Sequence, residues 1–470
     1  MRPRGTDVGG INTITAIVSF LSVTIAVTTP IGEAINLVLG HTIVTGLADR
    51  AWNRIREAAF NTGWTPMTRL AEMALVSLME RITVGELRVL TLSNVYEFRG
   101  SHSDEQSPLK AELRVVNDVF WVRLCTMGDL GFAEAYMYGD VECDDLVSLF
   151  MIFLENRENL SNLDSRLSYL FTLPQRLTSY RFLNTIGNSR SNISAHYDIS
   201  NDMFTGFLSE DLTYSCGIFE DLDGDHRNGK DELYEAQIRK LRHIFEKARI
   251  LPGHRVLEIG SGWGSMAMFI AQNSPDTTVD TITLSIQQQE LAIQRIKEAG
   301  LEDRIRVHLM DYRNMPAEWE GAFDRVISIE MIEAVGFEFL EKYWSVVDWA
   351  LKRKGGVGVV QAITIPEAIF PGGILPTLSL LFQTMEKGSG GRLIVDSVSN
   401  IGPHYARTLR EWRQRFLANF EDVVVPALKK EYPDVMTGRS GRSEIEVFKR
   451  KWLCDCYCEA GFTSRTLGGM

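Results

Sequence analysis

Short apolar runs alternate with longer amphipathic stretches through the second half of the chain. Five runs have the length and apolar content of buried strands, and they cover residues 256–259, 278–284, 305–309, 325–329 and 356–362. Between them apolar residues recur at helical spacing, for example over 287–299 and 337–351. Strands that alternate with helices are typical of a parallel sheet covered on both faces. We therefore predict an α/β domain with a doubly wound, Rossmann-like sheet over residues 184–470.

The first half of the chain shows a different pattern. Apolar runs at 85–92, 110–116 and 119–124 read as strands that follow one another without intervening long helices, and a helical pattern follows at 145–154. This order predicts a smaller α+β domain, to which we assign residues 51–183. A polar stretch beginning at residue 184 is the predicted linker between the two domains.

The first 50 residues stand apart from both predicted domains. Residues 8–31 carry no charge and follow Arg2 and Arg4, and they are long enough to span a bilayer as a helix. Their many Thr and Ser residues and their glycines weaken the apolar pattern. We expect residues 1–50 to form either an N-terminal anchor or a leader, peripheral to the chemistry.

The composition of the chain argues against some classes of binding partner. The chain has 470 residues, of which 45% are hydrophobic and 23% charged, and its net charge is −12. These proportions are those of a globular protein, and the negative charge argues against broad nucleic-acid binding. Six cysteines are too few for a disulfide scaffold. We expect no metal site, because the closely spaced Cys454, Cys456 and Cys458 have no partner pair nearby.

The candidate chemistry begins at the turn that follows the first strand of the predicted sheet. The apolar run ends at Ile259 and passes through Gly260, Gly262 and Gly264 into a helical pattern. Such a turn brings bare backbone N–H groups and a helix N-terminus close to a ligand. Glu258 lies at the carboxyl end of the strand, where open α/β sheets hold their ligands. This order favours the amino-acid end of S-adenosylmethionine (SAM) over a dinucleotide pyrophosphate.

A dinucleotide-dependent oxidoreductase is a distant alternative for the same turn. Many dinucleotide sites place an acid at the end of the second strand, where it binds ribose hydroxyls. Here that strand ends in Thr283-Leu-Ser285, and the nearest acid, Asp280, lies inside the strand. The pattern therefore favours SAM.

A second group of polar and aromatic residues comes just before the predicted sheet. It covers residues 194–204, with Tyr197 near its start, and residues 212–217 follow it closely. A segment in this place is positioned to fold over a cofactor as a lid. A helix capped by Asp198 or Ser200 is the alternative, and it accounts for the acid and hydroxyl spacing but not for the second aromatic cluster.

Seven motifs occur along the chain in a single order. They are His196-Tyr-Asp198, Tyr214-Ser-Cys216, the glycine turn, Thr283-Leu-Ser285 with Gln288, Glu330-Met-Ile-Glu333, Ile369-Phe-Pro-Gly-Gly373 and Gly402-Pro-His-Tyr-Ala-Arg-Thr-Leu409. Together they resemble the cyclopropane-fatty-acyl-phospholipid synthase and mycolic acid cyclopropane synthase family of SAM-dependent methyltransferases, over residues 80–468. The resemblance implies transfer of a methyl(ene) group from SAM to the cis double bond of an unsaturated phospholipid acyl chain, which forms a cyclopropane fatty acid.

This chemistry needs a dry pocket and a base. A cis double bond is a poor nucleophile, and its attack on the sulfonium methyl leaves a carbocation that must lose a proton. The resemblance implies that the base is a bound bicarbonate, held by the backbone of Cys216 and the side chains of Glu333 and Tyr405. Gln361 stands where the family has His, and Gln can hydrogen-bond an anion but carries no charge.

The resemblance also implies which residues surround SAM. Tyr214 and Ser215 are expected near the methionine end, Thr283 and Gln288 at the ribose, and Tyr312 beside the adenine. The full set of expected cofactor residues is Tyr197, Tyr214, Ser215, Glu258, Gly260, Gly262, Gly264, Thr283, Gln288 and Tyr312.

Each expected catalytic residue has a structural explanation when it is taken alone. Cys216 has the character of a small buried residue, Glu330 and Glu333 fit a charged first turn of a helix, and Tyr405 fits a core aromatic. Their common order along the chain favours the functional interpretation for Cys216, Glu333 and Tyr405. It favours Glu330 less strongly.

Three features depart from the family pattern. Ala334 stands where bacterial relatives often have His. Residues 365–369 replace a longer segment that walls the lipid tunnel in relatives, and the chain stops at residue 470 where relatives continue into a final strand. A missing strand leaves backbone groups unpaired, so we expect reduced activity.

Two other functions stay open at this point. One is a C-methyltransferase that branches a sphingolipid base, and the other is a catalytically impaired homologue that binds SAM or lipid. The expected partner is membrane phospholipid, without nucleic acid, and homodimer formation is left open. The expected location is the cytoplasmic face of a membrane, held peripherally or by an N-terminal anchor.

Overall fold

The computed structural model describes residues 12–20, 65–100, 109–160, 201–222, 232–364, 376–438 and 440–454. These residues form two compact units. The first unit contains the described residues of 12–20 and 201–408, and the second contains those of 65–160 and 409–454. The predicted domains differ from this division, because residues 409–454 belong with the smaller unit and residues 12–20 with the larger one.

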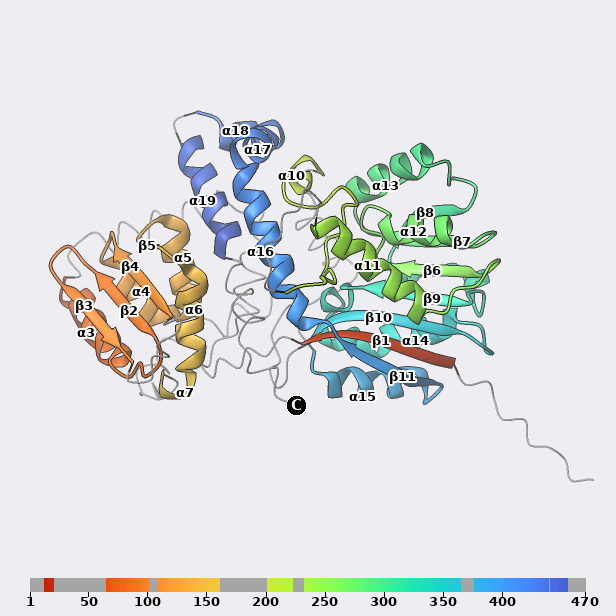
Figure 1. The fold of residues 1–470 in the computed structure, drawn as a ribbon, viewed down its shortest axis with the longest axis horizontal. Coiled ribbons are helices and arrows are strands. Elements are labelled where there is room, and N and C mark those ends of the chain that lie inside the picture. The colour runs from red at the N-terminus through yellow and green to blue at the C-terminus, as the bar shows by residue number, and fades with distance from the viewer. Residues whose placement is uncertain are drawn as a thin grey trace, which may run out of the picture. The chain divides into compact units, whose positions relative to one another are not determined.

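The first unit contains one parallel sheet. Its strands, within the described chain, follow the order β11-β1-β10-β9-β6-β7-β8 (Figure 1). Their bounds are β1 (Asn12–Phe20), β6 (Arg255–Ile259), β7 (Thr278–Thr283), β8 (Ile305–Leu309), β9 (Arg325–Ile329), β10 (Val357–Thr364) and β11 (Leu393–Asn400). Each neighbouring pair is parallel. The order reverses at β6, which pairs with both β7 and β9, so its carboxyl end opens at the point where such sheets bind ligands.

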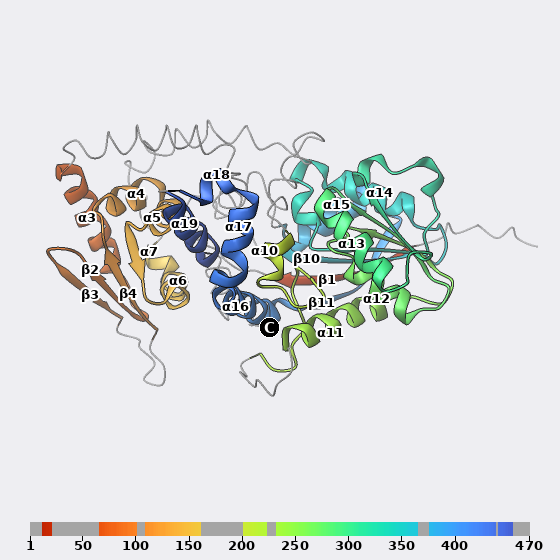
Figure 2. The same cartoon turned by 90° about the horizontal axis from the view of Figure 1, so that it is seen from above.

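Helices cover both faces of this sheet. They are α10 (Asn201–Thr205), α11 (Glu232–Lys247), α12 (Ser265–Asn273), α13 (Ile286–Glu298), α14 (Leu340–Ala350) and α15 (Leu378–Ser389). Figures 1 and 2 show α11 and α12 on one face and α14 and α15 on the other. Leu257, Val326 and Val347 are fully buried in the core between strands and α14. The predicted doubly wound α/β fold is confirmed, and the five predicted strands match β6 to β10 to within two residues at each end.

Strand β1 comes from the segment for which we expected an anchor or a leader. It lies between β10 and β11 and pairs in parallel with both. Thr, Ile and Val make up most of its sequence, and these β-branched residues favour an extended backbone. The backbones of β10 and β11 therefore have a strand partner between them. The shortened segment at 365–369 and the end of the chain after residue 454 lie outside the described residues.

The second unit is an α+β arrangement. Its strands follow the order β3-β2-β4-β5. Its strands and helices are α3 (Thr65–Met79), β2 (Glu86–Leu90), β3 (Val95–Arg99), β4 (Lys110–Val115), α4 (Val119–Met127), α5 (Asp129–Tyr138), β5 (Val141–Cys143), α6 (Leu146–Glu155), α7 (Arg157–Leu160), α17 (Val425–Glu431), α18 (Pro433–Met436) and α19 (Gly441–Cys454). Helix α16 (Gly402–Ala418) crosses from the first unit into the second at residue 408. Cys454 of α19 is buried in the same core as Leu87 and Leu113, which explains why the end of the described chain belongs to this unit.

One predicted strand of this unit is a helix. Residues 119–124 were expected to be extended, but they begin α4, which continues to Met127. The side chain of Asn117 accepts a hydrogen bond from Val119 N–H (3.1 Å) and starts the helical turn. Phe120, Trp121 and Val122 are all buried, and a short run that is buried on every side has no period that separates a strand from a helix.

Among the described residues, no helix is long and apolar enough to cross a bilayer.

Candidate active site

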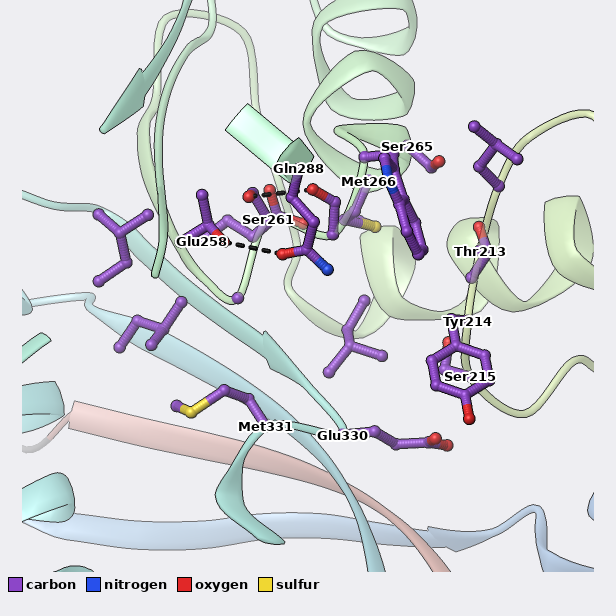
Figure 3. A pocket seen from close by; sticks show the side chains of 18 of the residues that line it. Thr213, Tyr214, Ser215, Glu258, Ser261, Ser265, Met266, Gln288, Glu330 and Met331 are labelled. Carbon is purple, nitrogen blue, oxygen red and sulfur yellow. Dashed lines mark hydrogen bonds between the residues drawn. The ribbon is translucent and has the colours of Figure 1, made fainter. Parts of the chain in front are cut away.

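A pocket of about 150 Å³ opens at the carboxyl ends of β6, β7 and β9. The loop before α11, the glycine turn and the start of α13 form its walls together with those strand ends (Figure 3). Residues that line it and were expected around the cofactor are Tyr214, Ser215, Glu258, Gly260, Gly262, Thr283, Gln288 and Tyr312. Tyr197 lies outside the described residues.

The glycine turn has the backbone that the sequence predicts. Gly260, Gly262 and Gly264 have φ values of 98°, 47° and 87°, which residues with a side chain rarely adopt. A Cβ atom at Gly260 would lie 3.3 Å from the side chain of Met331, so the turn also has little space for one. Gly264 does not line the pocket and instead caps the N-terminus of α12. The turn therefore brings bare backbone to the pocket at Gly260 and Gly262.

Polar groups at the end of β7 support one another. Thr283 Oγ1 donates to Gln288 Oε1 (2.8 Å), and Ser285 caps α13 by accepting from Gln288 N–H (3.2 Å). These bonds fix the amide of Gln288 against the pocket (Figure 3). The hydroxyl of Tyr312 is buried and has no hydrogen-bond partner among the described residues. An orphaned buried hydroxyl and a fixed amide fit a polar ligand that fills the pocket.

The acid at the end of β6 is buried. Glu258 is 2% exposed and accepts a hydrogen bond from Thr281 Oγ1 on β7 (2.6 Å). Burial raises the pKa of Glu258 to about 8, against smaller opposing effects of the Thr281 hydroxyl and the Lys240 ammonium. A carboxyl in this state becomes charged most readily when a cation binds next to it.

Asp280, the acid considered for a dinucleotide ribose, has a structural role. Its carboxylate accepts two hydrogen bonds from Arg255 (3.0 and 2.9 Å) and lies 2.9 Å from His308 Nε2. It does not line the pocket. The residue that the dinucleotide alternative requires is therefore committed to bonds within the sheet.

Glu330 lies at the centre of the expected catalytic residues. Its Oε1 accepts from Cys216 N–H (3.0 Å) and from Gln361 Nε2 (2.7 Å), and its Oε2 accepts from Tyr405 Oη (2.9 Å). Gln361 and Cys216 are fully buried. Glu330 follows β9 and extends toward the loop that carries Tyr214 and Ser215 (Figure 3). Four segments that are distant in the sequence thus meet at one carboxylate.

The environment of Glu330 acts on its pKa in two directions. Burial raises the pKa, while the bonds from Cys216 and Tyr405, the Lys240 ammonium and the bond from Gln361 lower it; the net pKa is raised. The side chain of Glu330 is surrounded by protein on most sides. It is still partly exposed, because it borders the pocket. Burial and the neighbouring carboxylate of Glu330 raise the pKa of Tyr405 well above 10, so its hydroxyl stays a donor.

Glu333 is close enough to Glu330 for the charge of Glu330 to act on it. We expected it to share a site with Cys216 and Tyr405, but Glu330 takes those bonds. Glu333 Oε1 accepts from Ile363 N–H (2.5 Å), and its Oε2 has no partner among the described residues. Burial and the charge of Glu330 raise the pKa of Glu333 to about 8. Spacing along the chain did not separate the two acids, because the backbone turns sharply at Glu330.

Two residues of α11 that the sequence analysis left out hold the loop at 213–216. Lys240 Nζ donates to Ser215 Oγ (2.8 Å), and Gln237 Nε2 donates to the Ser215 carbonyl (2.7 Å). Both side chains are fully buried, and burial lowers the pKa of Lys240 to about 8. The signal was available, because Gln237 and Lys240 fall on the apolar stripe that contains Leu233, Leu241 and Ile244. Polar residues on the buried stripe of a helix need a partner.

The chain is similar to known proteins over most of its length. A family model described as mycolic acid cyclopropane synthetase matches residues 185–436. The tuberculostearic acid methyltransferase UfaA1 of Mycobacterium tuberculosis (strain ATCC 25618 / H37Rv) is 35% identical over 73% of this chain and 78% of its own. The cyclopropane-fatty-acyl-phospholipid synthase of Escherichia coli (strain K12) is 33% identical over 67% of this chain and 78% of its own.

A solved structure supports the fold alone. Coclaurine N-methyltransferase, bound to N-methylheliamine and S-adenosylhomocysteine (SAH), is 19% identical and covers 71% of this chain and 94% of its own, with a TM-score of 0.50.

Proposed function

Because the chain belongs to the mycolic acid cyclopropane synthase family of SAM-dependent C-methyltransferases, we propose that it acts on the cis double bond of a phospholipid acyl chain and forms a cyclopropane ring. The observation that carries this proposal is the Glu330 carboxylate, held by three donors at the edge of the SAM pocket. An alkene gains a carbon from SAM and must then lose a proton, so a base beside the methyl donor suits this reaction. The relative from Escherichia coli supports phospholipid as the substrate.

The residues around the pocket fit SAM, which supplies an activated methyl group when it is bound. We propose that Gly260 and Gly262 offer backbone to its amino-acid end, and that Glu258 takes up the positive charge of its amino group. Thr283 and Gln288 present polar groups at the end of β7, where a ribose is expected. The ordered bonds at these residues keep the methyl donor in one orientation, which lowers the entropy cost of the transfer.

Bicarbonate fits this site poorly. The three donors expected to hold it, at Cys216, Gln361 and Tyr405, already bond to Glu330. A bicarbonate would have to displace that carboxylate and then lie beside it and beside Glu333. Two or three negative charges in a buried site repel one another strongly. We therefore route no step of the reaction through bicarbonate.

A methyl-branched product is the second candidate. It is favoured by the 35% identity to a relative whose name describes it as a methyltransferase. Branching begins with the same carbon–carbon bond and ends with proton loss at a different carbon. A sphingolipid base is the other alkene substrate for such branching.

Product analysis tests the proposed function. Purified full-length protein would be incubated with methyl-labelled SAM and vesicles of cis-monounsaturated phospholipid, with fully saturated vesicles as the control. We expect a one-carbon mass increase in the released fatty acids and cyclopropane proton signals by NMR. A labelled methyl branch would select the second candidate. SAM binding without any labelled lipid, in these vesicles and in vesicles that contain an unsaturated sphingolipid base, would contradict both and support the impaired homologue.

We also propose that the protein works at the cytoplasmic surface of a membrane, with the second unit in contact with lipid. Leu92, in the turn between β2 and β3, is 89% exposed. Leu70 and Met73 of α3 are also exposed, at 60% and 61%. Apolar side chains at a surface are suited to enter the interface of a bilayer. Vesicle flotation would test this, since Leu92→Asp is expected to reduce binding to vesicles while SAM affinity is kept.

Sedimentation in the same buffer would show whether the protein forms a homodimer.

A further inference from the structure

We propose that Glu330 is itself the catalytic base of this enzyme, and that its carboxylate removes the proton that the family resemblance assigns to a bound bicarbonate. This inference rests on the proposed function, because it needs a reaction that ends in the loss of a proton. It adds a residue role that the family resemblance does not supply.

Three donors contact the Glu330 carboxylate and divide unequally between its two oxygens. Cys216 N–H and the Gln361 amide both donate to Oε1, whereas among the described residues Oε2 accepts only from the Tyr405 hydroxyl. A carboxylate has about four acceptor positions, so Oε2 keeps a lone pair for a proton. Glu330 also lines the pocket that holds the glycine turn and Gln288. The carboxylate that keeps this lone pair therefore belongs to a residue at the border of the cofactor site.

The backbone at Glu330 has an unusual conformation. Its φ is +46°, in the left-handed region that favours glycine, and its N–H donates to the carbonyl of Gln361 (2.9 Å). A glutamate in this conformation is strained, and a residue without a side chain would not be. Strain of this kind is concentrated at functional sites, where the surrounding structure holds it in place. The chain bears the strain and thereby places a carboxylate among the three donors.

The charges around Glu330 leave little room for a second anion. The donors at Cys216, Gln361 and Tyr405 are all neutral, and the ammonium of Lys240 is the one cation of the described residues that acts on Glu330 through its charge. The same ammonium also acts on Glu258, so two carboxyl groups already share this cation. A second anion in the same place would have no cation of its own, which is unfavourable in a buried site.

In the proposed reaction, methyl transfer is followed by removal of a proton. The alkene forms a carbon–carbon bond with the methyl group of SAM, the carbon–sulfur bond breaks, and its electron pair stays on sulfur to give SAH. The other alkene carbon is left as a cation. Glu330 Oε2 then removes one proton from the new methyl group, and the electrons of that carbon–hydrogen bond close the ring. The carboxylic acid afterwards releases the proton to water. Burial raises the pKa of Glu330, which makes the carboxylate a better proton acceptor than an exposed one.

Dependence on bicarbonate is the decisive measurement. Wild-type protein would be assayed with SAM and unsaturated phospholipid vesicles in buffer stripped of carbon dioxide, with and without added bicarbonate. We expect equal rates. Glu330→Gln keeps the size of the side chain but cannot take a proton, and we expect a loss of turnover of about a hundredfold to ten-thousandfold with no recovery in bicarbonate.

Glu330→Gly provides the sharper test. Glycine suits the backbone at this position and frees the donors of Cys216, Gln361 and Tyr405 around an empty space. We expect this variant to be nearly inactive in stripped buffer and to regain activity as bicarbonate is added. Asp276→Gly is the matched control, because Asp276 also has a positive φ (55°) but lies on the exposed loop before β7. It should behave as the wild type does.

The outcomes separate this inference from the proposed function. Methyl transfer by the wild type that requires bicarbonate would overturn the role of Glu330 and leave the proposed function standing. Glu330→Gln that retains wild-type turnover would do the same. Absence of transfer by the wild type in every buffer would overturn the proposed function and this inference with it. SAM binding, measured by calorimetry for each variant, shows that a loss of turnover does not come from unfolding.

Discussion

Glu258 and Glu330 border the same pocket, yet their surroundings prepare them for different states. Glu258 accepts one side-chain hydrogen bond, from Thr281, and burial raises its pKa to about 8. Glu330 accepts three bonds, from Cys216, Gln361 and Tyr405, which work against the effect of burial. At similar depth, the carboxyl with more donors has more of the effect of burial offset. Glu258 is ready to become charged when a cation arrives, whereas the donors to Glu330 favour its charged form although its net pKa is still raised.

Replacing each acid with its amide should show the largest difference between Glu258 and Glu330. Glu330→Gln is expected to lower kcat by about a hundredfold or more, since it removes the proton acceptor and leaves the cofactor contacts in place. Glu258→Gln is expected to weaken SAM binding by about tenfold to a hundredfold, the range for a lost bond to a charged group. Turnover at saturating SAM and calorimetry of SAM binding separate the two effects. Equal losses of kcat in both variants would show that the two acids do not have separate roles.

Lys240 is the group that the two acids share, and replacing it should affect both. Lys240→Met removes the ammonium that favours the charged forms of Glu258 and Glu330 and also the bond to Ser215 Oγ. We expect SAM affinity to fall by about tenfold. The acid limb of the pH–rate profile should move to higher pH, because the pKa of Glu330 rises.

A second lysine on the same helix provides the control for this variant. Lys247 Nζ donates to Ser397 Oγ (3.0 Å) and does not line the pocket. Lys247→Met should leave the pH–rate profile unchanged. A shift of equal size in both variants would show that α11 acts through stability alone.

The smallest expected effect is on stability as pH changes. The pKa of Glu258 is about 8 in the folded protein and 4.5 for an ordinary glutamate, so the folded state holds that proton more tightly. The stabilisation is complete below pH 4.5 and is lost as pH rises through about 8, by at most about 1.4 kcal/mol per pH unit for one carboxyl. Thermal unfolding without SAM should therefore show a Tm that falls over this window. Glu258→Gln should flatten the slope, and an unchanged slope would contradict the protonated state of Glu258.

The sheet was predictable because each of its central strands is a short apolar run with helices on either side. Val256 and Leu257 in β6 are fully buried, as the run at 256–259 predicts. The run at 119–124 shows the limit of this method, since complete burial hides the period that distinguishes a helix from a strand. β1 could not be predicted, because its partners β10 and β11 come from the other end of the chain.

The site was predictable in its members but not in its connections. The motifs name Cys216, Gln361 and Tyr405, which do meet in the structure. They favour Glu333 over Glu330, because a linear pattern contains no information about the backbone angle that turns Glu330 toward the donors. Lys240 was missed for a related reason: its partner Ser215 is 25 positions away and is joined to it only by the fold.

The positive φ of Glu330 has a consequence for how enzymes of this kind can diverge. Codons for glutamate and glycine differ at a single base, and glycine is the residue that this backbone angle prefers. One nucleotide change therefore converts a site that carries its own base into an open anion site among the same three donors. An enzyme with the glutamate works at any level of dissolved carbon dioxide. A descendant with glycine would tie lipid modification to the carbon dioxide supply of the cell, without any other change in its fold.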